Sequence, residues 1–415
     1  MISALLVIKP IPASRVYKRK PTMKKPITLI LLLLVFFSCD TDDADPTATI
    51  ATTNSEIKKG IFGLRDGAVL SDLGAEYTRI ITWDSDIKAI YADVDNGVPL
   101  ENNLYYNQVK GIHDNGVKII VTLRWPDQNS ADPALYDRVP QAQDRIESLD
   151  LLSRFLNDFG PWLEIYSVQN EVGGLGPGTY IEENMVNTGS GSPAALWWQD
   201  IVERVASEKE SNPNLTHLKI GSPVPVLLKR LVFDSSGLPQ TNIDFFYETV
   251  AFGNEYCDYV DLHLNTLSLS EYEETLFFLN GLVTQPMMAT EWSEVSSANA
   301  YIAQPISSEL ASYAEEINYT IPGSVTTNDA LVEHLYDNPS TLDFWQFMVQ
   351  ESNYEEGFMA QSSALLSAAG FEILCWNSGW QEGLTAYDLR SFYATKTVGS
   401  ANNELSGFTN EFKNL

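Results

Sequence analysis

The segment EIYSVQNEVGG, residues 164–174, joins a strand-like run to an ionisable group at its end. Apolar residues such as Ile165 and Val168 are typical of a buried β-strand. The run then ends in Asn170 and Glu171, and a glycine-containing loop follows. A carboxylate beside an amide at the tip of a buried strand has no evident folding role, so it indicates a functional site.

Seven further strand-like runs occur along the chain, separated by amphipathic stretches such as residues 134–160 and 193–210. The eight runs are GIFGL (60–64), YTRIITW (77–83), VKIIVTLRW (117–125), WLEIYSVQN (162–170), LKIGSPV (218–224), DYVDLHLN (258–265), PMMATEW (286–292) and FEILCWN (371–377). They are apolar at nearly every position, as in strands that are buried on both faces. Eight βα units predict an α/β fold, a (β/α)8 TIM barrel that forms a single domain over residues 58–415. The alternative is a doubly wound sheet, which the absence of a glycine-rich phosphate loop after the first run disfavours.

The N-terminal part of the chain predicts an export signal rather than fold. In KKPITLILLLLVFFSC (24–39) two lysines precede an apolar run of about 11 residues, which is too short to span a bilayer and fits a signal peptide. Residues 1–38 are therefore the expected signal peptide, with Met23 as the expected true start. Ser38 and Cys39 resemble the lipobox of bacterial lipoproteins, which implies lipidation of Cys39, although Phe36 stands where that pattern prefers leucine.

Residues 39–57 are acidic and then rich in Thr and Ser, as in a flexible tether. An acidic run directly after a lipidated cysteine also resembles the surface-export signal of some Gram-negative lipoproteins. We therefore expect a lipoprotein of the cell envelope, in the outer membrane or at the cell surface. The alternative is a periplasmic or secreted protein with a chance cysteine.

Charge excludes some partners. Seven of the 26 Lys and Arg precede Cys39 and none of the 55 Asp and Glu does, so 19 basic residues face 55 acidic ones afterwards, a net charge of −36. Such a surface repels nucleic acid and anionic lipid, so we expect no nucleic-acid partner and membrane contact through the lipid alone. It favours a neutral substrate or a salty environment.

Cysteine and histidine placement argues against disulfides and metals. Cys257 lies at the start of the sixth strand, directly before the run 258–265, and Cys375 lies late in the eighth run. Two strand spacings place them roughly 10 Å apart, beyond the usual disulfide reach of about 7 Å, so both are expected to be reduced and buried. The four histidines are scattered without HxH or HExxH spacing, so no metal or cofactor is expected.

Two glutamates end strands of the predicted barrel. The fourth run ends in Asn170 and Glu171, and the seventh ends close to Glu291. Catalytic groups of such barrels lie at the carboxyl ends of the strands, so both glutamates are expected at one mouth. A retaining glycosidase has two catalytic carboxyls about 5–5.5 Å apart, of which one gives a proton and the other attacks the anomeric carbon. Their surroundings must then separate their pKa values.

This placement resembles the clan A glycoside hydrolases, over roughly residues 58–405. The resemblance implies that Glu171 is the acid/base, that Glu291 is the nucleophile and that Asn170 holds the sugar 2-hydroxyl. Many members have proline after the acid/base, where this chain has Val172. The family therefore stays open within the clan, and so does the sugar.

Four other segments fit the same resemblance by residue type. Arg79 in TRIITW would lie beside the nucleophile and keep it ionised. His263 in DLHLN would bond near the nucleophile or the −1 sugar, and Trp376 in LCWN would lie under that sugar. Trp125 and Trp292, just at strand ends, are candidates for further sugar stacking. The family's strand-three histidine and strand-six aromatic hydroxyl are missing, with Arg124-Trp125 and Asn265 in their places.

Structural readings of these residues stay open. Glu171 is alternatively a helix-capping carboxylate, Glu294 is an alternative nucleophile, and Arg65 is an alternative guanidinium. His263 and Trp376 are alternatively core residues. The long connections 172–195 and 293–340 are expected to be loops that shape the groove.

The sequence thus predicts a monomeric retaining glycoside hydrolase that cleaves a neutral β-linked polysaccharide or oligosaccharide. The alternative is a surface glycan-binding lipoprotein on a barrel that has lost catalysis. A metal-dependent barrel hydrolase is a third and less favoured possibility.

Overall fold

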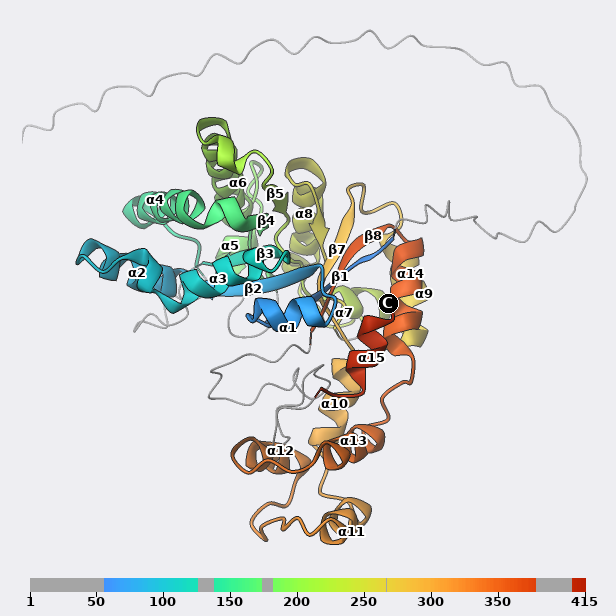
Figure 1. Ribbon diagram of the computed structural model, residues 1–415. Coiled ribbons are helices and arrows are strands. Elements are labelled where there is room, and N and C mark those ends of the chain that lie inside the picture. Colours follow the sequence, from blue (N-terminus) through green and yellow to red (C-terminus); the bar gives the residue numbers. More distant parts are fainter. Residues whose placement is uncertain (1–55, 126–137, 174–181, 266, 378–404) are drawn as a thin grey trace, which may run out of the picture. The chain divides into compact units, whose positions relative to one another are not determined.

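A computed structural model describes residues 56–125, 138–173, 182–265, 267–377 and 405–415 of the chain (Figure 1). Eight parallel strands form one sheet in the order β5-β4-β3-β2-β1-β8-β7-β6. Their bounds are β1 Lys58–Phe62, β2 Tyr77–Trp83, β3 Lys118–Arg124, β4 Leu163–Ser167, β5 Lys219–Gly221, β6 Val260–Asp261, β7 Met287–Trp292 and β8 Phe371–Trp376. The two outer strands meet through a parallel bridge between Gly221 and Tyr259. The sheet is therefore a nearly closed TIM barrel, which confirms the predicted α/β fold and excludes the doubly wound alternative.

Helices follow the strands along the chain (Figure 1). Those between β1 and β5 are α1 Gly67–Asp72, α2 Asp84–Asp95, α3 Leu104–Asp114, α4 Ala142–Phe159, α5 Glu182–Met185 and α6 Pro193–Ser211. Those between β5 and β7 are α7 Leu228–Phe233, α8 Gln240–Tyr256 and α9 Leu269–Leu279. After β7 come α10 Val295–Ile302, α11 Ser308–Glu316, α12 Asn328–Asp337, α13 Leu342–Glu351 and α14 Phe358–Ala368, and α15 Phe408–Lys413 ends the chain.

The continuous apolar runs are explained by two cores, one on each side of the sheet. A small core fills the barrel with side chains such as Tyr77 and Met288, and a much larger one lies between strands and helices. The barrel interior is tightly packed at Gly60, since a Cβ there would lie only 2.7 Å from the sulfur of Cys375. A glycine is therefore required where β1 passes β8.

Local sequence signals set the helix starts. Ser192 caps α6 by accepting a hydrogen bond from the Ala195 amide, and Pro193 follows it at the first helical position. Ser268 and Glu271 form a reciprocal capping box at the start of α9. These signals fix where each helix leaves the end of its strand, and with it the strand-end loops.

The connection 293–340 differs from the expected loop. It contains α10, α11 and α12, and Tyr313 of α11 stacks on Phe347 of α13 with ring centroids 4.6 Å apart. Apolar residues at helical spacing explain the difference, because each of these short helices buries one face against another. The connection 172–195 contains α5, and its residues 174–181 lie outside the described part.

Cys257 and Cys375 are both free and buried, as predicted. Burial raises the pKa of each thiol. The expected signal peptide, Cys39 and nearly all of the tether lie outside the described residues. Among the described helices, none has the length and apolarity needed to cross a membrane.

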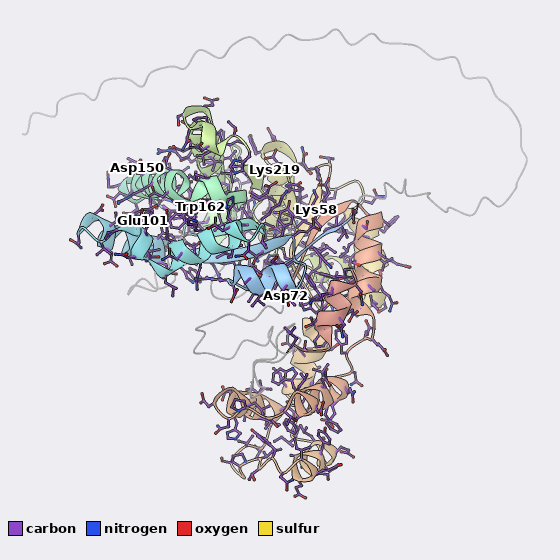
Figure 2. The ribbon with its side chains drawn as sticks, in the orientation of Figure 1. Lys58, Asp72, Glu101, Asp150, Trp162 and Lys219 are labelled. Carbon is purple, nitrogen blue, oxygen red and sulfur yellow. The ribbon has the colours of Figure 1, made fainter. Side chains whose placement is uncertain are left out.

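The amino ends of the strands carry partly exposed charged residues. Figure 2 labels Lys58 and Lys219, which begin β1 and β5, and Trp162, which immediately precedes β4. Lys58 lies 3.9 Å from Glu372 in a half-exposed ion pair, a type worth little to stability. The buried ionisable groups gather at the opposite ends of the strands.

Candidate active site

Five polar residues converge at the carboxyl ends of the strands. Arg79 lies on β2, Asn170 and Glu171 follow β4, His263 follows β6, and Glu291 lies on β7. One carboxylate oxygen of Glu171, one of Glu291 and a ring nitrogen of His263 all lie within 4.8 Å of one another. The structure therefore brings the two predicted glutamates together at one mouth.

Three donors hold Glu291, whose side chain is only 2% exposed. Arg79, fully buried, donates from Nη1 to Oε1 over 2.6 Å. Asn265 and Asn377 both donate from Nδ2 to Oε2, over 2.9 and 3.0 Å. Donors on every side match a carboxylate, which only accepts hydrogen bonds, and they fix the direction in which its oxygens point.

A register irregularity on β7 brings Glu291 into this cluster. Along a regular strand alternate residues face the barrel, and Met288 does so. The pairing of β7 with β8 shifts between Ala289 and Trp292. Thr290 and Glu291 therefore both reach the polar cluster, since such an irregularity redirects a side chain.

Arg79 also joins the two strand ends. Its Nη2 donates to Oδ1 of Asn170, which is buried, and its guanidinium lies over the Phe62 ring with 5.0 Å to the centroid. The structure thus places Arg79 beside Glu291, as expected. Arg65, the alternative guanidinium, instead donates to the carbonyl of Ile81.

Glu171 stands in a conformation that non-glycine residues rarely adopt. Its φ is +40°, and its side chain is 39% exposed. Left-handed backbone costs about 1–2 kcal/mol and concentrates at functional sites. The turn directs the carboxylate to His263, whose Nδ1 lies 3.1 Å from Oε1. No described helix begins at Glu171, so the capping alternative has no support.

The surroundings of Glu171 favour its ionised form. Burial raises the pKa of its carboxyl, but the hydrogen bond and charge of His263, with the charges of Arg79 and Arg124, lower it to about 2. A general acid must carry a proton at neutral pH, so the ionised Glu171 carboxyl differs from the protonated form that the expected acid/base role requires. Glu171 is therefore expected to gain its proton when a bound substrate removes water from the carboxylate.

A hydrogen-bond chain assigns the tautomer of His263. Thr290 Oγ1 donates its hydrogen to Oδ2 of Asp261 over 2.7 Å. A lone pair of Thr290 Oγ1 is therefore left to accept a hydrogen bond from His263 Nε2, which lies 3.3 Å away. Nε2 then carries a hydrogen, and Nδ1 is the ring nitrogen that faces Oε1 of Glu171. Asp261 is fully buried, and burial raises its pKa.

Removing the imidazole is expected to raise the pKa of Glu171. In His263→Gln the carboxyl should titrate well above 2, because burial is then opposed only by the two arginines. Carbon-13 NMR of labelled glutamate measures this, with Glu171→Gln to assign the signal. An unchanged titration would contradict the ion pair.

The same shift has a consequence for stability. A carboxyl whose pKa falls from 4.5 to about 2 on folding stabilises the protein above pH 4.5, and this contribution is lost as pH falls toward 2. In His263→Gln the loss over that range should be smaller. Thermal unfolding between pH 2 and 7 checks the sign.

The tryptophan predictions need correction. Trp376, Trp292 and Trp125 are 0%, 0% and 1% exposed and offer no face to a sugar. Trp376 and Trp292 pack edge to face at 5.2 Å, and Trp125 packs likewise on Trp197 at 5.9 Å. Strand alternation is the reason: on β8 Cys375 faces the barrel, so Trp376 faces the helices.

Sequence reasoning missed Asn265 and Asn377 as site residues. Asn377 follows Trp376 and therefore turns back to the barrel, which the period of two along a strand could have indicated. Asn265 stands where the resembling family has an aromatic hydroxyl. In the structure its amide donates to Oε2 of Glu291 over 2.9 Å.

Glu294 is not an alternative nucleophile in this geometry. Its Oε2 accepts from the Glu355 amide at 3.0 Å, and its Oε1 accepts from Ser297. Burial raises its pKa. It ties α10 to the segment before α14 and does not join the cluster of Glu171 and Glu291.

Glu171, His263 and Glu291 have the spacing of a metal site, but the surroundings fit a metal poorly. Glu291 already accepts three hydrogen bonds. The fully buried Arg79 cation would lie next to any bound metal ion. A metal ligand set needs free lone pairs and no adjacent cation, so we expect a metal-independent site.

No family model and no curated protein matches the chain. Among solved structures, a fungal β-1,4-galactanase is 13% identical with TM-score 0.44, covering 87% of this chain and 100% of its own. A GH5_18 protein from Bifidobacterium longum is 10% identical with TM-score 0.45, covering 87% and 78%. Xylanase 10B from Thermotoga maritima is 11% identical with TM-score 0.44, covering 88% and 95%. Likenesses of this size do not assign an activity to this chain.

Proposed function

We propose that this protein is a retaining glycoside hydrolase acting on a β-linked polysaccharide or oligosaccharide. The observation that carries the proposal is the approach of Glu171 and Glu291 oxygens to within 4.8 Å. Retaining enzymes hold their carboxyls about 5–5.5 Å apart, whereas inverting ones need about 6.5–9.5 Å to admit a water. The short separation therefore favours direct attack by a carboxylate.

The two glutamates take different roles because their surroundings differ. Glu291 is buried and held by donors alone, so it attacks the anomeric carbon and forms the glycosyl-enzyme. Glu171 is partly exposed and touches a proton carrier, so it protonates the leaving oxygen and then activates water. Asn170, oriented by Arg79, is placed to hold the 2-hydroxyl of the −1 sugar.

Substrate binding supplies Glu171 with its proton. A sugar that covers the exposed part of the side chain removes water from the carboxylate, and burial is the influence that raises its pKa. His263, whose Nδ1 lies 3.1 Å from Oε1, is the positioning residue that holds this carboxyl in place.

Glu171→Ala is the variant that tests this assignment. Its kcat should fall about 10²–10⁴-fold on β-glucans, mannans, xylans or galactans, which need leaving-group protonation. Aryl glycosides with acidic leaving groups should still form the glycosyl-enzyme. Added azide should then restore turnover, with a β-glycosyl azide as the product. Azide that restores nothing, or yields the α-product, would contradict the assignment.

A glycan-binding protein without catalysis is the rival proposal. It does not require a buried Arg79–Glu291 pair or a strained Glu171, and both features are present. On the same polysaccharide panel, binding without sugar release by the parent protein of residues 40–415 would favour the rival. Hydrolysis that EDTA abolishes would instead favour a metal-dependent enzyme.

We also propose that a lipid on Cys39 anchors the mature protein in the cell envelope, at the outer membrane or cell surface. The support is the sequence of residues 23–39. Cys39→Ala should release the protein from the membrane fraction of expressing cells. Equal membrane association of the variant would count against the anchor.

A further inference from the structure

A pocket of about 410 Å³ opens beside Glu171. Its floor includes Glu171, His263 and Asn265, and its wall is the segment from Pro225 to Asp234, which comprises the loop after β5 and helix α7. The volume lies in the range of small-molecule sites. The pocket therefore continues the catalytic mouth toward β5 and β6.

The pocket lies on the leaving-group side of the site. Glu171, the proposed proton donor, lines it, whereas Glu291 does not. The sugar that is attacked must lie over Glu291, so a sugar in the pocket is the one that leaves. This step rests on the proposed function.

Arg230 gives this pocket a positive wall. Its side chain is half-buried, and within the described residues its guanidinium has no hydrogen bond or ion pair. Its neighbour Lys229, which also lines the pocket, is bound to Glu271 of α9 over 2.8 Å. That ion pair braces α7 against α9 and leaves Arg230 as the cation available to a ligand.

The wall is also built with strain. Leu227, which lines the pocket just before α7, has φ +75°. Two of the non-glycine residues with left-handed backbone, Leu227 and Glu171, thus line the same cavity. Strain of this kind is retained where a loop must hold a functional shape. The ring of Phe233, 38% exposed, adds an apolar surface suited to a sugar face.

We propose that this pocket binds the leaving-group sugar through a negatively charged substituent, a carboxylate or a sulfate ester, held by Arg230. The guanidinium presents a planar fork of donors that matches such an anion. Asp234 also lines the pocket, but it accepts a hydrogen bond from Ser236. The substrate is then anionic at this position, which departs from the neutral substrate inferred from net charge.

The net charge of the chain does not oppose this binding. Salt at physiological strength screens exposed charges beyond about 8 Å, so the distant acidic residues act weakly inside the pocket. Arg230 lines the same cavity as the carboxyls of Glu171 and Asp234, so its guanidinium is the nearby cation that an anionic substituent can meet there.

Binding of three monosaccharide probes tests the proposal without any need for hydrolysis. D-glucose, D-glucuronate and D-glucose 6-sulfate are titrated by ligand-detected NMR at low and high salt. The parent should bind an anionic probe roughly tenfold more tightly than glucose, the size expected of a charge-assisted pair, and salt should reduce the preference. Preference for glucuronate identifies a carboxylate site, preference for the sulfate a sulfate-ester site, and preference for both a general anion site.

Three variants complete the experiment. Arg230→Gln should lose the preference, and Arg230→Lys should keep part of it because the charge stays while the fork is lost. Arg154→Gln is the matched control, since Arg154 pairs with Asp95 on the helical surface, and it should keep the full preference. No preference in the parent, or an undiminished preference in Arg230→Gln, would overturn the proposal. Anion preference in a protein that hydrolyses nothing would refute only the proposed catalysis.

Discussion

Glu291→Gln is expected to lower kcat by at least about 10⁴-fold on every hydrolysed substrate, because the attacking carboxylate is gone. The amide is nearly isosteric, so substrate affinity should survive within a few fold. Rates on the responding polysaccharide and on an aryl glycoside measure the loss. Both substrates should be affected, since a nucleophile is needed whatever the leaving group.

Glu294→Gln is the control for that experiment. Glu294 lies three residues further on and is similarly buried, but it binds Glu355 and Ser297 outside the cluster. Folded Glu294→Gln should keep the parental kcat within a few fold. If the two variants exchanged effects, Glu294 would be the nucleophile and the assignment of Glu291 would be wrong.

Arg79→Met is expected to destabilise the protein by about 3–5 kcal/mol and to suppress catalysis. Arg79 is fully buried, and its removal leaves the buried Glu291 carboxylate without its counter-charge. Arg65→Met is the matched control, because Arg65 donates to the backbone carbonyl of Ile81 and not to a buried carboxylate, and it should cost less than about 1.5 kcal/mol. Urea unfolding and kcat give the two readouts.

The double variant Arg79→Met/Glu291→Gln separates charge from packing. With both charges gone, no uncompensated ion stays buried, so the free energy lost should be clearly smaller than the sum of the two single losses. Additive losses would mean that the ion pair is not what Arg79 contributes.

The sequence was sufficient for the architecture because strands that are buried on both faces leave unbroken apolar runs. The eighth run, FEILCWN, became β8 with its end displaced by one residue. Strand-end position then placed Glu171 and Glu291 at one mouth. The connection 293–340 holds three helices where a loop is expected, because helices this short are marginal by themselves and are stabilised by packing on one another.

The finer site was harder to predict because it depends on where side chains point. The alternation of β8 turns Trp376, the expected sugar contact, toward the helices and turns Asn377 toward Glu291. The register irregularity on β7, which lets Thr290 and Glu291 act together, has no simple sequence signal. The contact of His263 with Glu171 depends on the left-handed turn at Glu171, a tertiary constraint.

The stereochemistry of the first product distinguishes retention from inversion. Proton NMR of a reaction with a β-linked substrate resolves the α- and β-anomers before mutarotation mixes them. With Glu291 as nucleophile and Glu171 as acid/base, the β-anomer is expected to form first, since two displacements at one carbon restore its configuration. Initial formation of the α-anomer would show inversion, and it would contradict the roles assigned to Glu171 and Glu291.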